Sequence, residues 1–307
     1  MILTEIFKKA LDGGYAIGQF NVSNLEQIRA ICEVAKALQS PLILGTSEGE
    51  RKFIGLKQIT AIAKVWQEET GLPIIVNADH SRSFETAKTA YDAGYTGIHF
   101  DGSEFPYEEN LKITKRVVEY VKSKNPDVIV EGELGRVRGS SEVHNEAIVL
   151  RESDFTDPDL AMQFIKESGV DSLAISYGNI HGVFGVSHSP RVTLGELHGE
   201  EVPKDGPWKT EKLDIERLKD IREKAGAFLV LHGGSGISAI DVKESIKNGI
   251  VKVNINTELR VAYVNTLREF LNKSEETTPY KIWPAVIEAV KKVVEEKMRL
   301  FGSINKI

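Results

Sequence analysis

Residues Phe228 to Arg260 read FLVLHGGSGISAIDVKESIKNGIVKVNINTELR, and they set the pattern for the whole chain. The stretch contains two short apolar runs, FLVL and IVKVNI, separated by a segment at 239–248 that is predicted to be one helix. A strand, a glycine turn, a helix and a second strand form one βαβ unit. Because the glycines of HGGSG expose backbone N–H groups ahead of a helix, the turn is suited to a phosphate. Phosphate binding alone, however, does not require His232 in that turn.

The same alternation of apolar run and helical segment extends over the chain. Eight strands are expected at 15–22, 41–46, 73–79, 96–101, 128–134, 172–177, 228–231 and 250–255. Helices are expected at 4–11, 23–38, 56–69, 84–93, 107–123, 159–168, 215–225, 239–248, 259–272 and 283–301, with Ser23 and Glu26 as a capping box. Two polar stretches, 135–158 and 178–213, are expected to be long loops. Eight repeats favour an α/β fold, a closed (β/α)₈ TIM barrel with extra N- and C-terminal helices in one domain, 1–307, over a doubly wound sheet.

Charge and composition exclude several classes of partner. The net charge is −6, with acidic and basic residues mixed along the chain, so nothing favours nucleic acid. No apolar run approaches the roughly 20 residues that span a membrane, and the N-terminus lacks the apolar core of a signal peptide. The single cysteine, Cys32, cannot form an internal disulfide and is expected to be buried. These features predict a cytoplasmic protein that binds neither nucleic acid nor membranes.

Histidines and carboxylates lie at the carboxyl ends of several predicted strands. His80 follows the third strand, His181 lies just beyond the sixth, and His232 follows the seventh. Asp101 ends the fourth strand, and Glu133 lies on the fifth. Because these strand ends meet at one end of a barrel, we expect the side chains to converge. Three neutral imidazoles with carboxylates nearby suit a catalytic Zn²⁺ that keeps one open position.

Each of these residues also has a structural interpretation. A single histidine at a strand end is more often a hydrogen-bonded structural residue than a ligand, and only the set of three favours a metal. His99, inside the fourth strand, is expected to pack within the barrel or to support the ligands. Glu131 and Glu133 point the same way along one strand, and two buried carboxylates are unfavourable unless they meet a metal, a cation or hydrogen-bond donors.

The order and spacing of the motifs resemble those of class II, metal-dependent ketose-bisphosphate aldolases. The resemblance covers essentially the whole chain, through GQFNVSN, TSEGE, ADHSRSFE, FDGS, EGELG, GNIHG, LHGGSGI, KVNINTELR and RLFGS. It implies reversible cleavage of fructose 1,6-bisphosphate to dihydroxyacetone phosphate and glyceraldehyde 3-phosphate through a zinc-stabilised enediolate, in glycolysis and gluconeogenesis. Tagatose bisphosphate or another ketose phosphate is the alternative substrate, and the family forms dimers or tetramers.

The resemblance also implies roles for single residues. His80, His181 and His232 would hold Zn²⁺, and Asp79 would be the acid/base at the cleaved carbon–carbon bond. Asp101 and Glu133 match positions that can hold a second divalent metal, and a monovalent cation is a further ion that the family allows. The substrate-binding positions are Gly182, Gly233, Ser235, Asn254, Asn256, Thr257 and Arg260, the last reaching the distal phosphate in some members.

Several positions depart from the family pattern. A loop acid that serves as a candidate proton donor aligns with Ser141, and Glu142 is one position away. A common lysine is replaced by Gly185, and a strand-eight aspartate by Asn256. These changes leave the aldehyde partner open. Two other classes stay open as well: a metal-dependent barrel hydrolase that uses a bridged metal pair, and a non-catalytic scaffold.

Overall fold

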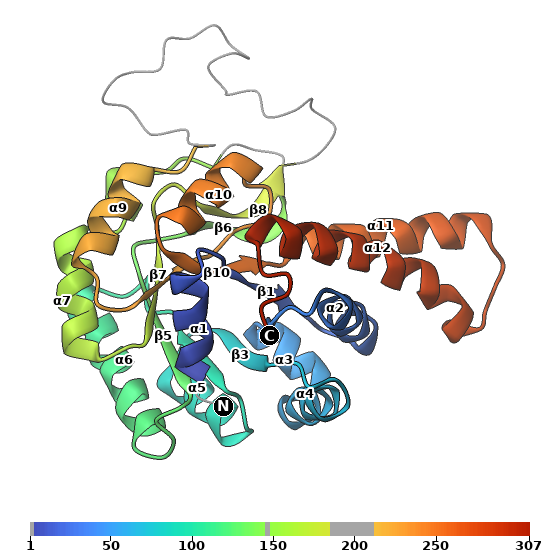
Figure 1. Ribbon diagram of the computed structural model, residues 1–307, viewed down its shortest axis with the longest axis horizontal. Helices are drawn as coiled ribbons and strands as arrows, with labels where there is room; N and C mark the ends of the chain where they lie inside the picture. Colours follow the sequence, from blue (N-terminus) through green and yellow to red (C-terminus); the bar gives the residue numbers. More distant parts are fainter. Residues whose placement is uncertain (1–2, 145–147, 185–211) are drawn as a thin grey trace, which may run out of the picture.

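Apolar runs that are buried on both faces form the parallel strands of a closed barrel. The computed structural model describes residues 3–144, 148–184 and 212–307 (Figure 1). The barrel strands are β1 (Ile17–Asn21), β2 (Leu42–Thr46), β3 (Ile74–Ser81), β4 (Gly97–Phe100), β5 (Ile129–Leu134), β7 (Ser172–Ile175), β9 (Phe228–Leu231) and β10 (Ile250–Ile255). They follow the order β1-β10-β9-β7-β5-β4-β3-β2, with every neighbour parallel. The predicted (β/α)₈ barrel is confirmed.

Helices surround the barrel and pack their apolar faces on the strands. They are α1 (Leu3–Asp12), α2 (Leu25–Leu38), α3 (Glu48–Ile54), α4 (Leu56–Thr70), α5 (Phe84–Asp92), α6 (Tyr107–Lys122), α7 (Pro158–Ser168), α9 (Ile215–Lys224), α10 (Ala239–Lys247), α11 (Thr257–Lys273) and α12 (Pro279–Phe301), with a 3₁₀ turn at Glu152–Asp154. Cys32 is buried in α2, as expected, and burial raises the pKa of its thiol to about 12.

The amino-terminal end of the barrel is filled by α1. Ile6 and Phe7 pack in one buried cluster with the first inward residues of several strands, including Ile17, Ile43 and Ile75. This apolar cluster is separate from the main core, which lies between the strands and the outer helices. The polar strand ends therefore lie at the opposite end of the barrel.

One predicted helix cap differs from the structure, and one short helix was not predicted. The cap of α2 is Asn24, whose side chain accepts from the Gln27 N–H, while Ser23 instead bonds the Gln27 side chain. The short helix α3 was not predicted. It begins with a capping box in which Ser47 and Glu50 satisfy each other's backbone N–H groups.

Parts of both polar stretches form strands where loops were expected. Within their described parts, β6 (Arg138–His144) and β8 (Ile180–Phe184) form a two-stranded parallel sheet of their own, in which Gly139 pairs with His181. His181 is therefore carried by β8 and not by the end of the barrel strand β7, which stops at Ile175. Residues 185–211 of the second stretch, which include Gly185, lie outside the described residues.

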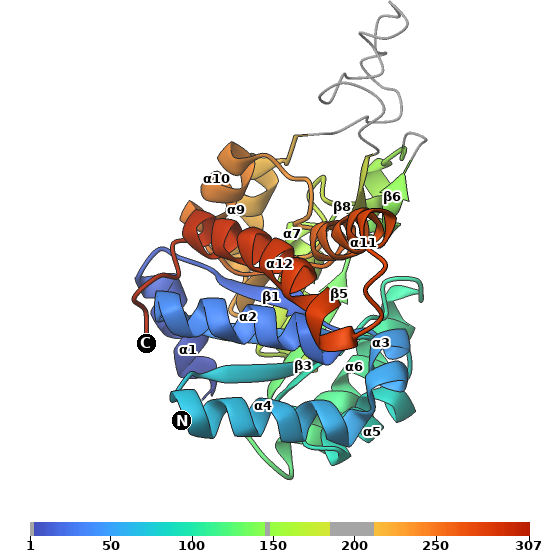
Figure 2. The ribbon, with the colours of Figure 1, turned by 90° about the vertical axis from the view of Figure 1, so that its right-hand side faces the viewer.

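The long helices α11 and α12 form a hairpin that projects beside the barrel (Figures 1 and 2). The carboxyl-terminal half of α12 lies over the barrel, where Phe301 is buried and its carbonyl accepts from the Ala16 N–H. Lys297 of α12 pairs with Glu258 of α11 at 2.6 Å. Toward the hairpin tip, Leu271 and Tyr280 are exposed. None of the helices in the described part of the chain is long and apolar enough to cross a membrane.

Candidate active site

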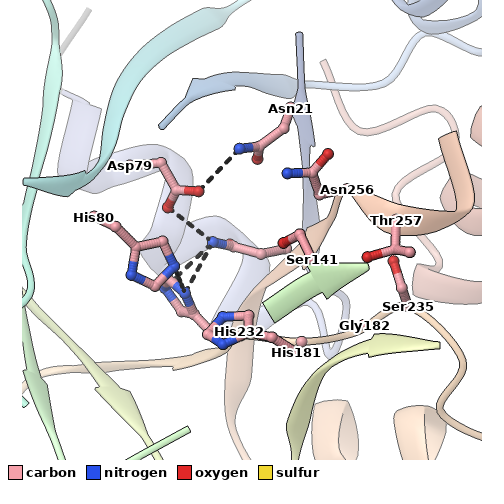
Figure 3. A pocket seen from close by; sticks show the side chains of 12 residues that line it. Asn21, Asp79, His80, Ser141, His181, Gly182, His232, Ser235, Asn256 and Thr257 are labelled. Carbon is pink, nitrogen blue, oxygen red and sulfur yellow. Dashed lines mark hydrogen bonds between the residues drawn. The ribbon is translucent and has the colours of Figure 1, made fainter. Parts of the chain in front are cut away.

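A bulge in β3 turns two consecutive side chains into the barrel mouth. Neighbouring residues of a regular strand point to opposite faces. Here β3 advances three residues, from Ala78 to Ser81, while the paired β4 advances two. At this bulge His80 has a left-handed backbone with φ of 47°. As a result, Asp79 and His80 both line the same cavity (Figure 3).

The cavity lies at the carboxyl ends of the barrel strands, and its empty space, including the part open to solvent, is about 290 Å³. It brings together most of the site residues that the sequence predicted. Its lining residues are Asn21, Asp79, His80, Ser141, His181, Gly182, His232, Gly233, Ser235, Asn254, Asn256 and Thr257. The strand-end argument thus located the cavity, although the roles of its residues stay predictions.

Each of the three central histidines uses one ring nitrogen for a partner outside the cavity. The contacts are His80 Nδ1 with Asp101 Oδ2 at 2.6 Å, His232 Nε2 with Glu131 Oε1 at 2.8 Å, and His181 Nδ1 with the Val137 carbonyl at 3.3 Å. Outer partners of this kind fix the tautomer and the ring orientation of a metal-ligating histidine. They leave Nε2 of His80, Nδ1 of His232 and Nε2 of His181 for a ligand.

Two of these remaining nitrogens are spaced like two ligands of one tetrahedral metal. His80 Nε2 and His232 Nδ1 are 3.2 Å apart, close to the roughly 3.3 Å expected between two ligands at 2.0–2.1 Å from zinc. The His181 Nε2 is buried and has no hydrogen-bond partner among the described residues. Burial, followed by the charges of His80 and His232, lowers the pKa of His181 to about 3. Its imidazole is therefore neutral at physiological pH, the form that binds a metal.

Asp79 is the carboxylate that lines the same cavity as these histidines. Asn21 donates to its Oδ2 at 3.0 Å and Asn254 to its Oδ1 at 3.3 Å. Burial opposes its charge, but the positive field of His80 and of two further imidazoles outweighs burial and holds the pKa of Asp79 well below its usual range. Asp79 is thus an ionised, oriented carboxylate on the cavity wall.

The carboxylates predicted for a second metal lie on the other side of His80. Asp101 accepts from the His80 ring, and Glu133 Oε2 is buried, 3.7 Å from the same nitrogen and without a hydrogen bond. The ligand atoms of His80, Asp101 and Glu133 lie within 4.8 Å of one another. A metal at this position would replace the hydrogen bond between His80 and Asp101, so the second-metal role stays a prediction.

The glycine turn and the amino-terminal end of α11 form the opposite wall. Gly233 has φ of 65°, and a Cβ there would lie 2.0 Å from the Ile180 carbonyl oxygen. Gly182, with φ of 99°, is similarly crowded. Ser235 and Thr257 line the cavity beside the first turn of α11. Backbone packed this closely, next to hydroxyl groups and a helix amino terminus, offers hydrogen-bond donors to an anion.

Of the residues at or near positions that depart from the family pattern, some line the cavity and others do not. Ser141 lines the cavity, whereas the neighbouring Glu142 is exposed. Arg260 is not among the lining residues, and its guanidinium instead donates to the Ser141 carbonyl. Asn256 does line the cavity, and its Oδ1 is buried without a hydrogen-bond partner.

Three residues of the site carried no prediction. Asn21 bridges Asp79 and the carboxylate of Glu50, which also contacts Asn256 at 3.3 Å. Lys252 is buried inside the barrel, where it pairs with Glu131 at 2.7 Å. A signal was present for Lys252, since a lysine within the apolar run IVKVNI needs a buried partner.

Known proteins resemble this chain over its whole length. A family model described as fructose-bisphosphate aldolase class-II matches residues 2–306. The fructose-bisphosphate aldolase of Geobacillus stearothermophilus is 36% identical over 310 residues, covering 99% of this chain and 97% of that protein. That of Staphylococcus aureus strain Mu50 is 34% identical, covering 99% and 98%. The crystal structure of the YdjI aldolase from Escherichia coli K12 matches with a TM-score of 0.78 at 29% identity, covering 99% and 97%.

A closed barrel with three histidines and an aspartate around one cavity at its mouth is typical of a barrel enzyme with a metal site. The matched length and the identities then show the family: the chain belongs to the class II fructose-bisphosphate aldolases. It is therefore an aldolase, a lyase, as the sequence predicted. Family membership argues against both the hydrolase and the non-catalytic scaffold.

Breaking the buried ion pair between Lys252 and Glu131 should destabilise the fold. In Lys252→Met the carboxylate of Glu131 stays buried without its cation, so we expect the free energy of unfolding to fall by about 3–5 kcal/mol. Lys247→Met, at an exposed lysine of α10, is the matched control and should change stability little. Urea unfolding followed by circular dichroism measures both. Equal stability of the two variants would show that the ion pair is dispensable.

Proposed function

We propose that the protein is a zinc-dependent ketose-bisphosphate aldolase that cleaves fructose 1,6-bisphosphate reversibly to dihydroxyacetone phosphate and glyceraldehyde 3-phosphate. The observation that carries the proposal is one cavity lined by His80, His181, His232 and the ionised Asp79, in which the free ring nitrogens of His80 and His232 lie 3.2 Å apart. When bound, zinc supplies a Lewis acid that polarises the substrate carbonyl. The named relatives support the substrate, since they are fructose-bisphosphate aldolases.

Asp79 acts as the acid/base of the reaction. In cleavage it takes the proton from the C4 hydroxyl, and in condensation it returns that proton to the aldehyde oxygen. Asn21 and Asn254 each donate to one of its oxygens and so aim the carboxylate into the cavity. Holding reactant and base in register in this way removes orientational entropy from the barrier.

The phosphate of the dihydroxyacetone half binds at the glycine turn. Gly182 and Gly233 let the backbone approach closely, and Ser235 and Thr257 add hydroxyl donors. The amino terminus of α11, which begins at Thr257, favours the negative charge. Together these groups fix the end of the substrate that does not react.

Asn256 and Arg260 are the residues we assign to the aldehyde half of the substrate. Asn256 presents a buried, unpaired amide oxygen to the cavity, which suits a substrate hydroxyl donor. It is therefore the residue we assign to the choice between fructose and tagatose bisphosphate. Arg260 would have to leave the Ser141 carbonyl to reach the distal phosphate.

Further features complete the proposal. Residues 1–307 act as one domain, and the assembly is a homodimer or homotetramer, supported by apolar Leu271 and Tyr280 exposed near the hairpin tip. Asp101 and Glu133 hold a second divalent metal, supported by the ligand atoms within 4.8 Å of one another. A monovalent cation near the phosphate, a cytoplasmic location and a place in glycolysis and gluconeogenesis remain predictions from the sequence.

Removing the metal should abolish activity. Dialysis against a chelator is expected to eliminate cleavage of fructose 1,6-bisphosphate, and added Zn²⁺ should restore it. Treatment with borohydride and substrate should leave the enzyme active, because no lysine Schiff base forms. A lysine adduct found by mass spectrometry after borohydride would reject the zinc mechanism.

Asp79→Asn separates proton transfer from metal binding. The amide keeps the shape but cannot accept the proton, so kcat should fall by about 10²–10⁴. The zinc content measured by atomic absorption should match that of the wild type. Asp127→Asn, at an exposed loop aspartate, is the control and should keep full kcat. Loss of zinc from Asp79→Asn would instead make Asp79 a ligand.

A panel of substrates tests the aldehyde half. Coupled assays of dihydroxyacetone phosphate release should give the highest kcat/KM with fructose 1,6-bisphosphate, ahead of tagatose 1,6-bisphosphate and a ketose monophosphate. Asn256→Ala should change the ratio between the two bisphosphates, because it removes the unpaired amide oxygen. A preference for the monophosphate would reject the bisphosphate assignment but leave the aldolase reaction standing.

A further inference from the structure

The peptide that joins Asp79 to His80 lies outside the regular hydrogen bonding of the barrel. The pairing of β3 with β2 ends at Thr46 and Ala78. On the β4 side the ladder resumes beyond the bulge, where Asp101 N–H donates to the Ser81 carbonyl at 3.0 Å. The carbonyl of Asp79 and the N–H of His80 therefore need partners from elsewhere.

Arg51 supplies the partner on the carbonyl side. This side chain belongs to α3 and is only 5% exposed. Its Nη1 donates to the Asp79 carbonyl at 3.0 Å and to the Thr46 carbonyl at 2.9 Å, and its Nη2 donates to Ser81 Oγ at 3.0 Å. One planar guanidinium thus joins the end of β2 to both sides of the bulge.

His99 supplies the partner on the N–H side. The backbone N–H of His80 donates to His99 Nδ1 at 3.1 Å, and the His99 ring is fully buried. The bond is made at the residue whose φ of 47° departs from the strand conformation. It therefore stabilises the backbone turn that directs the His80 ring into the cavity.

We infer that Arg51 and His99 are positioning residues that clamp the Asp79–His80 peptide from its two sides. The clamp holds the bulge so that a base and a metal ligand, adjacent in sequence, face the same reacting atoms. The inference rests on the proposed function, because it concerns how the proposed base and ligand are oriented. Neither clamping side chain lines the cavity.

His99 has two further contacts. Its Nδ1 lies 3.6 Å from Asp79 Oδ1, and its other ring nitrogen faces Glu133, a contact that the experiment must separate from the clamp. The His99 Nε2 lies 3.1 Å from Glu133 Oε2, a close contact without hydrogen-bond geometry in the described part of the chain. Asparagine places an amide atom near the position of Nδ1, and glutamine places one near Nε2. His99→Asn therefore keeps the clamp and loses the contact with Glu133, whereas His99→Gln does the reverse. His99→Leu removes both.

The readout is zinc affinity, measured by competition with a chromogenic chelator, together with kcat. Because partners outside the ligand set typically contribute 10–100-fold to metal affinity, we expect His99→Leu and His99→Gln to bind zinc about 10–100-fold more weakly. His99→Asn should keep most of the wild-type affinity and kcat. Arg51→Met should weaken zinc binding in the same direction, and Arg29→Met, at an exposed arginine of α2, should not.

The outcomes are distinguishable. Wild-type zinc affinity in both His99→Leu and Arg51→Met would overturn the clamp. The clamp would also be overturned if His99→Gln kept the wild-type zinc affinity and His99→Asn lost it, because His99 would then act through its contact with Glu133. If circular dichroism shows that His99→Leu does not fold, the zinc affinities of His99→Asn and His99→Gln are sufficient to test the clamp. A wild-type protein without zinc affinity would reject the proposed function itself, and the clamp with it.

Discussion

A buried chain of charges underlies the barrel mouth. Lys252 and Glu131 face each other at 2.7 Å inside the barrel, from β10 and β5. The second oxygen of Glu131 holds His232, whose other ring nitrogen faces His80. Burial opposes ionisation of Glu131, but Lys252 and the histidine outweigh burial and keep its pKa below the usual range. The orientation of the candidate ligands therefore depends on an ion pair that is buried from solvent.

The charge around the histidines favours a cation. The carboxylates of Asp79, Asp101, Glu131 and Glu133 are all buried at this end of the barrel, and only two of them pair with a lysine or arginine among the described residues: Glu131 with Lys252 and Asp101 with Arg82. Concentrated negative charge in a low-dielectric site is unfavourable without a counter-charge. A divalent ion between the imidazoles would supply that charge. The imidazoles near Asp79 lower its pKa, which keeps the carboxylate ionised and able to accept a proton.

The sequence predicted what depends on local pattern. Apolar runs located the eight barrel strands, and the positions of His80, His181 and His232 at or just beyond predicted strand ends placed them together, in one cavity that all three line. Features that depend on distant contacts escaped. The bulge at His80 is stabilised by Arg51 and His99, which no local rule connects to it. The β6–β8 sheet forms from two polar stretches without alternation, because its partners are brought together by the barrel itself.

The separate sheet gives the metal a second physical role. His80 and His232 belong to the barrel, whereas His181 lies on β8, whose strand partner is β6 and not a barrel strand. An ion held by all three would cross-link two sheets that share no ladder of hydrogen bonds. Its release would lower the cooperativity between barrel and sheet while leaving the barrel closed, so occupancy of one small site would govern how far the mouth of the enzyme behaves as a single rigid unit.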